Sequence, residues 1–299
     1  MPSVSSNLAS AMADAAKSVS DALERLLPQS DYAEKKLFDA MRYGALNGGK
    51  RLRPFLVLSS ASIFGVADEC ALRAAAAVEC VHCYSLIHDD LPAMDDADLR
   101  RGSPTVHKVY DEATAILAGD ALLTLAFEIL ADPRTHEDPQ VRCKLITALA
   151  KASGVHGMVG GQMLDLVAET SKLDIGAITR LQRLKTGELI AFSAEAGAIL
   201  GKTSQQHHNA LRAYAHDLGL AFQIIDDLLD AEGTEAETGK SVGRDAKAGK
   251  ATFVTVLGAE RAREQAKLLS EQAIRHLAVF SGRAKSLEDV ARFVVDRKS

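Results

Sequence analysis

The sequence contains no tryptophan, and aromatic residues make up only 5% of its 299 positions. It also has no run of alternating apolar and polar residues longer than a few positions, the pattern expected of half-buried strands. Apolar residues reach 47% and charged residues 25%, and Ala, Leu, Glu and Lys, which all favour helices, are abundant. These features predict an all-α protein and argue against a sheet-based fold.

Positive charge is not in excess, because the formal net charge is −5. Nucleic-acid binding depends on a basic face that releases counterions, so we expect no nucleic-acid partner.

Cysteine is scarce, and the four cysteines lie in apolar or helical stretches, as buried thiols of a reducing compartment do. Cys80 and Cys83 form a C-x-x-C pair, but a second pair is missing, so neither a zinc site nor a redox site is expected.

Long apolar runs and nucleotide-binding motifs are also missing. The longest apolar run, over residues 52–67, is interrupted by Arg53 and is too short to span a bilayer. The first residues contain no apolar signal core and no arginine before Arg25, so we expect a cytoplasmic protein without stable membrane insertion. No P-loop and no G-x-G-x-x-G turn occurs, which favours a small diphosphate over a nucleotide as the phosphate ligand.

The remaining pattern predicts one large helical domain. Residues 1–18 are rich in Ser and Ala and weakly patterned, and we expect a flexible N-terminal arm or a loose first helix there. From residue 19 to residue 299, apolar residues recur at helical spacing with short breaks, as in a single bundle of long, mostly antiparallel helices. The segment 72–91 is apolar nearly all round, which predicts a helix in the middle of that bundle.

The buried segment ends in a cluster of carboxylates. Pro92 disfavours helix at the residue before it, so Asp89 and Asp90 are expected in the last helical turn. Two carboxylates at the negative end of a helix dipole, followed by Asp95, are unfavourable unless a cation neutralises them. The pattern therefore predicts a metal ion at this helix end.

A second acidic cluster follows 137 positions later. Gln223, Asp226, Asp227 and Asp230 stand at i, i+3, i+4 and i+7, which places them on one helix face. A single Asp-Asp pair is more often a solvated surface or a helix cap, but two clusters joined to apolar helices favour a shared site. Oxygen ligands without sulfur or paired imidazoles select Mg²⁺, commonly together with substrate phosphate oxygens.

Cations are placed next to both acidic clusters. A glycine pair precedes Lys50, Arg51 and Arg53, and Arg100-Arg101-Gly102 follows the first cluster. The second cluster precedes a Gly-rich stretch that contains Lys240 and Lys250. A group of three basic residues alone is usually a solvated surface patch. Here, however, basic residues accompany both acidic clusters, and arginine can bind a phosphate through two donors.

Together these motifs make the chain resemble the bacterial short-chain isoprenyl diphosphate synthases, in particular those that make farnesyl diphosphate, from about Tyr43 to the C-terminus. The motifs that carry the resemblance are Asp89-Asp90-x₄-Asp95-Asp96 with Arg100-Arg101-Gly102, Gly-Gly-Lys50-Arg51-Leu-Arg53-Pro, Gly161-Gln162-x-x-Asp165-Leu, Lys185-Thr186-Gly187, Asp226-Asp227-Leu-Leu-Asp230, and Gly239-Lys240 with Lys250. The resemblance implies the isoprenoid synthase fold, with helices around a central substrate cavity, and a homodimer.

The resemblance also implies roles for individual residues. It assigns Mg²⁺, as three ions, to Asp89, Asp90, Asp95, Asp226 and Asp230. It assigns the allylic diphosphate to Arg100, Lys185, Lys240 and Lys250, and isopentenyl diphosphate to Lys50, Arg53, His82 and Arg101. It places the oxygens of Thr186 and Gln223, together with Lys185, at the reacting carbons. A lone histidine on an apolar helix is more often a core residue, so His82 enters this set on the resemblance alone, and His88 could instead assist the metal.

Product length is expected to depend on the residues one turn before the first acidic motif. Tyr84 and Ser85 lie five and four positions before Asp89, deeper in the bundle, where a bulky ring would form the floor of the cavity. The resemblance implies a C15 product, farnesyl diphosphate, from dimethylallyl and geranyl diphosphates. The alternatives are a geranylgeranyl diphosphate synthase, an enzyme like the terpene cyclases, and a non-catalytic subunit. The stretch after the second motif departs from the family pattern, with Val254 in place of a frequent proline.

Overall fold

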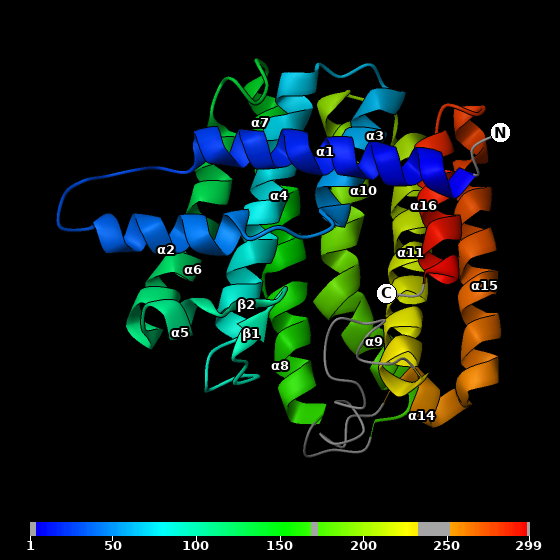
Figure 1. The fold of residues 1–299 in the computed structure, drawn as a ribbon. Coiled ribbons are helices and arrows are strands. Elements are labelled where there is room, and N and C mark those ends of the chain that lie inside the picture. The colour runs from blue at the N-terminus through cyan, green and yellow to red at the C-terminus, as the bar shows by residue number, and fades with distance from the viewer. Residues whose placement is uncertain (1–3, 169–172, 233–251, 298–299) are drawn as a thin grey trace.

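The computed structural model describes residues 4–168, 173–232 and 252–297 and confirms the all-α fold class (Figure 1). Helices α4, α10, α11 and α15 run side by side, and α1 and α2 cross the bundle on one face. In chain order the elements are α1 (Val4–Leu26), α2 (Lys35–Leu46), α3 (Leu52–Ile63), α4 (Asp68–Asp89), β1 (Leu99–Arg100), β2 (Ser103–Pro104), α5 (Val106–Val109), α6 (Glu112–Ala131), α7 (Pro139–Ser153), α8 (Met158–Ala168), α9 (Ile175–Gln182), η1 (Arg183–Gly187), α10 (Glu188–Leu200), α11 (Gln205–Glu232), α14 (Phe253–Leu257), α15 (Ala259–His276), η2 (Leu277–Phe280) and α16 (Lys285–Asp296).

Several helix starts follow directly from capping residues in the sequence. The side chains of Asp111, Asp138 and Asp174 accept hydrogen bonds from backbone amides in the first turns of α6, α7 and α9. Each cap satisfies a donor that has no partner within its helix. Helix α4 ends at Asp89, immediately before the segment that contains Pro92, as predicted.

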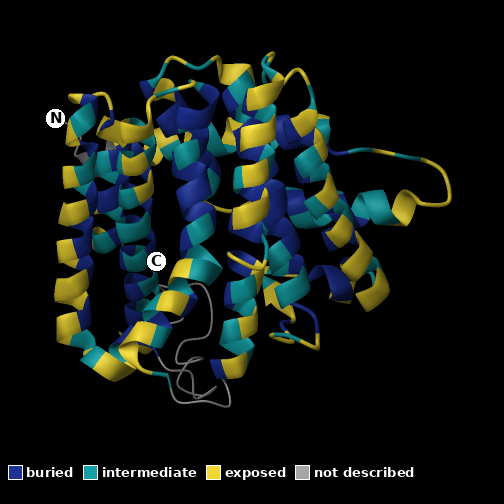
Figure 2. Cartoon of the chain, turned by 180° about the vertical axis from the view of Figure 1, so that it is seen from behind, coloured by how far each residue is buried: buried dark blue, intermediate teal, exposed yellow. Residues whose placement is uncertain are grey.

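Two helices in the middle of the bundle are buried nearly all round, α4 and α10 (Figure 2). Helix α4 packs against α3 and α6, and α10 packs against α3, α7 and α11. The buried apolar residues form two clusters, one around α4 and α6 and the other around α11 and α15. Helices α3 and α10 contribute side chains to both clusters and so connect them.

Of the two forms expected for the N-terminal segment, the structure has a helix rather than a flexible arm over the described residues from Val4 onward. Residues 4–26 form the single helix α1, which packs against α3, α4 and α16. Leu8, Met12, Val19 and Leu23 recur at helical spacing, and Leu8, Val19 and Leu23 are buried. The Ser- and Ala-rich composition obscured this apolar stripe, so the predicted boundary at residue 18 falls inside a helix.

One short hairpin interrupts the helical chain. Strand β1 pairs antiparallel with β2, and Arg101 and Gly102 form the turn with φ of 54° and 78°. Positive φ at both central residues is typical of the tight turn that matches strand twist. Arg100 therefore lies at the end of β1 and Arg101 in the turn that follows, rather than on a helix.

Two further expectations can be compared with the structure. Cys80 and Cys83 are buried as predicted, whereas the expectation for Cys143 was wrong, because α7 exposes it. Helices α4 and α6 are long and apolar enough to cross a membrane by length and composition. For α4 this reflects its place in the core, but α6 exposes Ile116 and Leu117.

Candidate active site

The first acidic motif lies where α4 ends. Asp89 is its last residue, and the backbone N–H of Asp95 donates to the Asp89 carbonyl over 2.8 Å, which folds the following loop back onto the helix end. Burial, with added repulsion from Asp95 and Asp90, raises the pKa of Asp89 to about 6 although Lys185 and Arg100 oppose this. The fold therefore holds a carboxylate where its negative charge is unfavourable, chiefly because the carboxylate is buried.

Asp90 has a different environment from Asp89. Its side chain is 4% exposed, and Arg100 donates to it through Nε over 3.0 Å and through Nη2 over 2.5 Å. This two-point contact joins the β1–β2 hairpin to the end of α4. The sequence assigned Asp90 to metal and Arg100 to the allylic diphosphate, and both assignments stay predictions. In the structure these two residues bind each other.

The second acidic motif lies on α11. Asp226 accepts a hydrogen bond over 2.6 Å from Nη2 of Arg297. Asp227 is buried and accepts hydrogen bonds over 3.0 Å from Gln223 Nε2 and from the backbone N–H of Phe253. Asp227 therefore ties the start of α14 to α11. Asp226, with Asp230 one turn later, remains as the candidate metal-binding side of the helix.

The predicted catalytic residues are brought together by a π turn, η1, between α9 and α10. Thr186 Oγ1 donates to Gln223 Oε1 over 3.4 Å, and Lys185 Nζ binds Asp165 Oδ2 over 2.6 Å. A Cβ at Gly161 would lie 2.2 Å from the backbone nitrogen of Lys185, so only glycine lets α8 approach η1 this closely. Asp165 thus holds the ammonium group of Lys185 in place.

The four residues predicted to bind isopentenyl diphosphate line one cavity of about 150 Å³. Arg53 Nη1 lies 3.4 Å from His82 Nε2, and Arg101 Nη1 donates to the Gly48 carbonyl over 2.5 Å. Burial and the nearby charge of Arg53 lower the pKa of His82 well below its usual range, so the ring is neutral at pH 7. The residues that line the cavity are Met12, Lys50, Arg51, Leu52, Arg53, Glu79, His82, Arg101, Phe222, Phe293, Val294 and Arg297.

Arg297 is the functional candidate that the sequence did not indicate. It lines the cavity, binds Asp226, and lies 3.9 Å from the centre of the Phe222 ring. It therefore connects the basic cavity to the second acidic motif. Nothing in the sequence pattern near residue 297 pointed to this contact, because it joins positions 71 residues apart.

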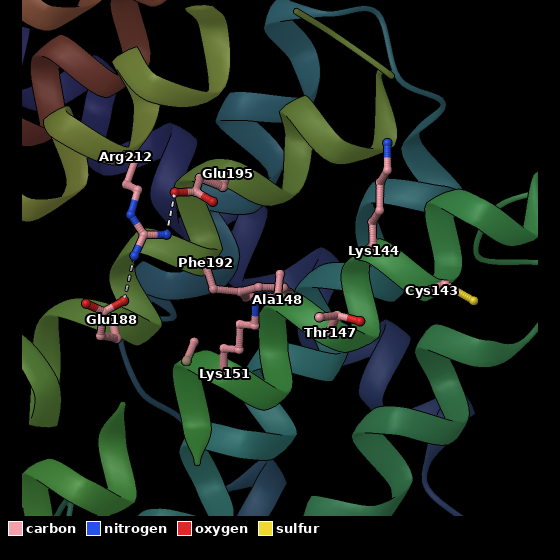
Figure 3. Close-up of a pocket in the computed structure, with 10 residues that line it drawn as sticks. Cys143, Lys144, Thr147, Ala148, Lys151, Glu188, Phe192, Glu195 and Arg212 are labelled. Atoms are coloured by element: carbon pink, nitrogen blue, oxygen red, sulfur yellow. Dashed lines mark hydrogen bonds and ion pairs between the residues drawn. The ribbon is translucent and has the colours of Figure 1, made fainter. Parts of the chain in front are cut away.

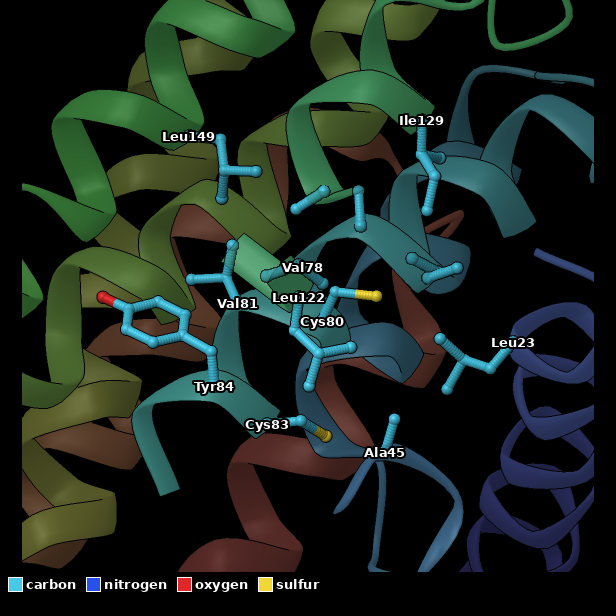
Figure 4. Close-up of a cluster of buried hydrophobic side chains, with 14 of the residues drawn as sticks. Leu23, Ala45, Val78, Cys80, Val81, Cys83, Tyr84, Leu122, Ile129 and Leu149 are labelled. Carbon is cyan, nitrogen blue, oxygen red and sulfur yellow. The ribbon is translucent and has the colours of Figure 1, made fainter. Parts of the chain in front are cut away.

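The chain-length candidates lie deeper on α4. Tyr84 is 6% exposed and projects into the apolar interior among residues of the buried cluster (Figure 4). Its ring meets the His88 ring edge-on at 5.7 Å, and burial, with the charge of Asp89, raises the pKa of Tyr84 to about 12. Ser85 is half-buried and donates to the His82 carbonyl. Tyr84 therefore presents an apolar, uncharged ring one turn below the first motif.

A larger hollow of about 400 Å³ lies between α7, α10 and α11 (Figure 3). Arg212 binds both Glu188 and Glu195 at its edge, each over 3.1 Å. None of the site residues predicted from the sequence lines this hollow.

Lys240 and Lys250, the remaining predicted contacts of the allylic diphosphate, lie outside the described residues.

The donor chemistry of the two acidic motifs fits Mg²⁺. Among the described residues, no three His, Cys, Asp or Glu side chains are grouped closely enough to enclose a metal by themselves. Mg²⁺ commonly takes one or two carboxylates and completes its shell with water and substrate phosphate. The raised pKa of Asp89 shows that a nearby cation would relieve an unfavourable charge.

Comparison with known proteins identifies the family of this chain. The chain matches the polyprenyl synthetase family model over residues 34–285. It is 46% identical over 286 residues to the farnesyl diphosphate synthase of Escherichia coli, covering 94% of this chain and 96% of that protein. It is 41% identical to the geranylgeranyl diphosphate synthase of Cyanophora paradoxa over 94% of this chain and 93% of that protein.

A solved structure shares the fold along nearly the whole chain. An FPP/GFPP synthase from Zymomonas mobilis superposes with a TM-score of 0.89 at 51% identity, covering 97% of this chain and 99% of that chain. The isoprenoid synthase fold implied by the sequence motifs is therefore confirmed. The chain belongs to the polyprenyl synthetase family.

Proposed function

We propose that this protein is a Mg²⁺-dependent prenyltransferase that condenses isopentenyl diphosphate with dimethylallyl or geranyl diphosphate to give farnesyl diphosphate. The observation that carries the proposal is the cavity in which Lys50, Arg53, His82 and Arg101 meet. A compact set of cations around a small cavity suits a diphosphate, whose charge is high for its size. The similarity to proteins named farnesyl diphosphate synthase supports the same reaction class.

We propose that the two diphosphates bind at two chemically different sites. The basic cavity suits isopentenyl diphosphate directly, through arginine and lysine donors. The acidic motifs instead suit an allylic diphosphate that arrives with Mg²⁺, which Asp89, Asp95 and Asp226 would hold with help from Asp230. This difference gives each substrate its own place and supports a two-substrate enzyme over one that ionises a single substrate, such as a terpene cyclase.

The reaction breaks the allylic C–O bond, joins the allylic carbon to the terminal alkene carbon of isopentenyl diphosphate, and then loses a proton. Mg²⁺ supplies electrostatic stabilisation of the negative charge that develops on the departing diphosphate. Lys185, held by Asp165, adds a fixed positive charge. The oxygens of Thr186 and Gln223 face the allylic cation, and the apolar helices exclude water from it. The departing diphosphate serves as the base.

We propose that the product ends at C15 because the Tyr84 ring would block a growing chain below the first motif. The ring is buried and uncharged, so it blocks a growing chain by volume. Geranylgeranyl diphosphate is the second candidate product, because a relative named geranylgeranyl diphosphate synthase is 41% identical. The two outcomes differ in the depth of the apolar space beyond residue 84.

A homodimer is proposed from apolar surface that the single chain leaves exposed. Ile116 and Leu117 on α6 are 44% and 54% exposed, and Met163 on α8 is 58% exposed. Large apolar side chains gathered on a helix surface typically pack against a partner. A second copy of this chain is the partner proposed, in the cytoplasm, and a protein that elutes as a monomer would contradict the dimer.

The proposal is tested with purified protein, Mg²⁺, labelled isopentenyl diphosphate and each allylic diphosphate. We expect Arg101→Met to raise KM for isopentenyl diphosphate about tenfold or more, because it removes a charged contact from the cavity. Arg212→Met is the matched control, since Arg212 lies at the other hollow, and it should leave both KM values unchanged. Product formed without isopentenyl diphosphate, or no product without an added partner protein, would contradict the proposed function.

A further inference from the structure

Arg51 lies between two predicted substrate contacts but is oriented differently from both. Its guanidinium is 1% exposed, and its backbone has φ of 48° and ψ of 40°, a left-handed conformation that is unfavourable for an arginine. Such strain persists only where the surrounding structure imposes it, and it is often found at functional sites. The contacts of Arg51 therefore have to account for this conformation.

The side chain of Arg51 is held from two directions. Nη1 lies 2.5 Å from Glu79 Oε1 on α4, and Nη2 donates to the Ala45 carbonyl at the end of α2 over 2.6 Å. Cys83 Sγ lies 3.8 Å from Nη1, and burial raises the pKa of that thiol to about 12, so it stays neutral. Arg51 thus fastens the segment that carries Lys50 to two helices at once.

The pair between Arg51 and Glu79 is not optimised for stability. Within the described part of the chain, Arg51 Nε and Glu79 Oε2 are buried without a hydrogen-bond partner. A buried ion pair with unsatisfied atoms typically adds no stability compared with apolar residues of similar size. Retention of such a pair is better explained by what it positions than by the stability it contributes.

Arg101 is positioned by the same segment. A Cβ at Gly49 would lie 2.5 Å from Arg101 Cζ, so the glycine leaves room for the guanidinium to lie against the backbone. Gly49 has φ of 113°, which side chains rarely adopt. The place of Arg101 in the cavity therefore depends on where the backbone of residues 48–51 is held.

On the basis of the proposed function, we propose that Arg51 and Glu79 are positioning residues that hold residues 48–53 against α4, so that Lys50, Arg53 and Arg101 converge on the diphosphate of isopentenyl diphosphate. Arg51 itself is not proposed as a substrate contact, because its side chain is 1% exposed and both of its terminal nitrogens point at protein oxygens. Loss of the pair displaces the cations by a small distance, and small misplacements of binding groups have large kinetic effects.

The first test replaces both partners with apolar residues, as Arg51→Met with Glu79→Leu. Because no buried charge is left unpaired, we expect Tm to stay near the wild-type value or to rise. KM for isopentenyl diphosphate should rise about tenfold, with kcat within about threefold and KM for the allylic substrate unchanged. Unchanged KM in a folded double variant, or a loss of kcat with an equal effect on both substrates, would overturn the positioning role.

Arg73→Met is the matched control. Arg73 is also a buried arginine and lies on α4, where it binds Asp132 and Thr135 and does not line the cavity. We expect it to lower Tm by roughly 10 °C, because it leaves partners unpaired, while KM for isopentenyl diphosphate stays at the wild-type value. A KM change in Arg73→Met equal to that in the double variant would show that destabilisation alone produces the effect.

Arg51→Lys provides a second variant if the double variant does not fold. Lysine keeps the charge opposite Glu79 but lacks the planar fork that also reaches the Ala45 carbonyl. We expect a KM for isopentenyl diphosphate several-fold above wild type, and an unchanged value would count against the proposal.

A binding measurement separates this inference from the proposed function. Inorganic diphosphate is titrated into the protein with EDTA, so that the acidic motifs repel it and the basic cavity is the expected site. The dissociation constant should rise about tenfold in the double variant. If the wild-type protein shows no turnover but this difference is found, the proposed function fails and the positioning role stands. Equal dissociation constants would refute the positioning role whatever the turnover.

Discussion

Asp89→Asn should stabilise the metal-free protein while abolishing most of its activity. The carboxylate is buried at the negative end of α4, and burial raises its pKa to about 6 from an ordinary value of 3.8. Between these two values the folded state holds a proton that the unfolded state has released. The stability of the wild-type protein therefore falls as pH rises from about 4 to about 6, and it stays lower above pH 6.

The size of the effect follows from the shift in pKa. The difference between about 6 and 3.8 is a little over two pKa units, and at 1.36 kcal/mol per unit it corresponds to about 3 kcal/mol. Asparagine keeps the shape and removes the charge, so we expect a gain of about 1–3 kcal/mol at pH 7.5. Thermal unfolding in EDTA should show a rise in Tm of roughly 2–5 °C.

The assay compares Tm in EDTA at pH 4 and at pH 7.5, where the gain should be absent and complete, respectively. Asp98→Asn is the control, because Asp98 is exposed and its hydrogen bond from Lys108 lowers its pKa, so its removal should bring no gain. A lower Tm for Asp89→Asn at pH 7.5, or an equal gain at both pH values, would refute the account of the first motif.

Three further predictions follow from the same site. Tyr84→Ala opens the space below the first motif, so chromatography should show products longer than C15, and an unchanged product would contradict the proposed floor. Gly119→Ala places a Cβ 2.1 Å from His88 Nε2, so the His88 ring must move from Tyr84. We expect a loss of about 1–3 kcal/mol, measured by thermal unfolding, and a broader range of products. Arg297→Met should raise KM for isopentenyl diphosphate several-fold, because the cavity loses a cation, and an unchanged KM would exclude Arg297 from that site.

The local sequence pattern was enough to predict the helices and the places on them where the acidic motifs lie. The end of α4 at Asp89 followed from Pro92, and the shared face of Gln223, Asp226 and Asp230 followed from their spacing. The family and its reaction class, predicted from motifs, are confirmed by the relatives. These features depend on neighbours in sequence, which is why the sequence alone indicated them.

Contacts between distant segments could not be predicted in the same way. The binding of Asp226 by Arg297 and of Arg51 by Glu79 depends on how helices pack, and no spacing rule encodes it. The two-point contact of Arg100 with Asp90 needed the hairpin turn at Arg101, which the helical pattern hid. The extent of helix α1, to Leu26, was not predicted, because alanine and serine diluted its apolar stripe.

The most direct test of the account is the product of the purified protein with Mg²⁺, dimethylallyl diphosphate and excess isopentenyl diphosphate. The account predicts farnesyl diphosphate as the main product, with geranyl diphosphate as the intermediate and no product when EDTA removes the metal. A cyclised hydrocarbon formed without isopentenyl diphosphate, or no condensation product at all, would contradict the two-site reaction on which the account rests.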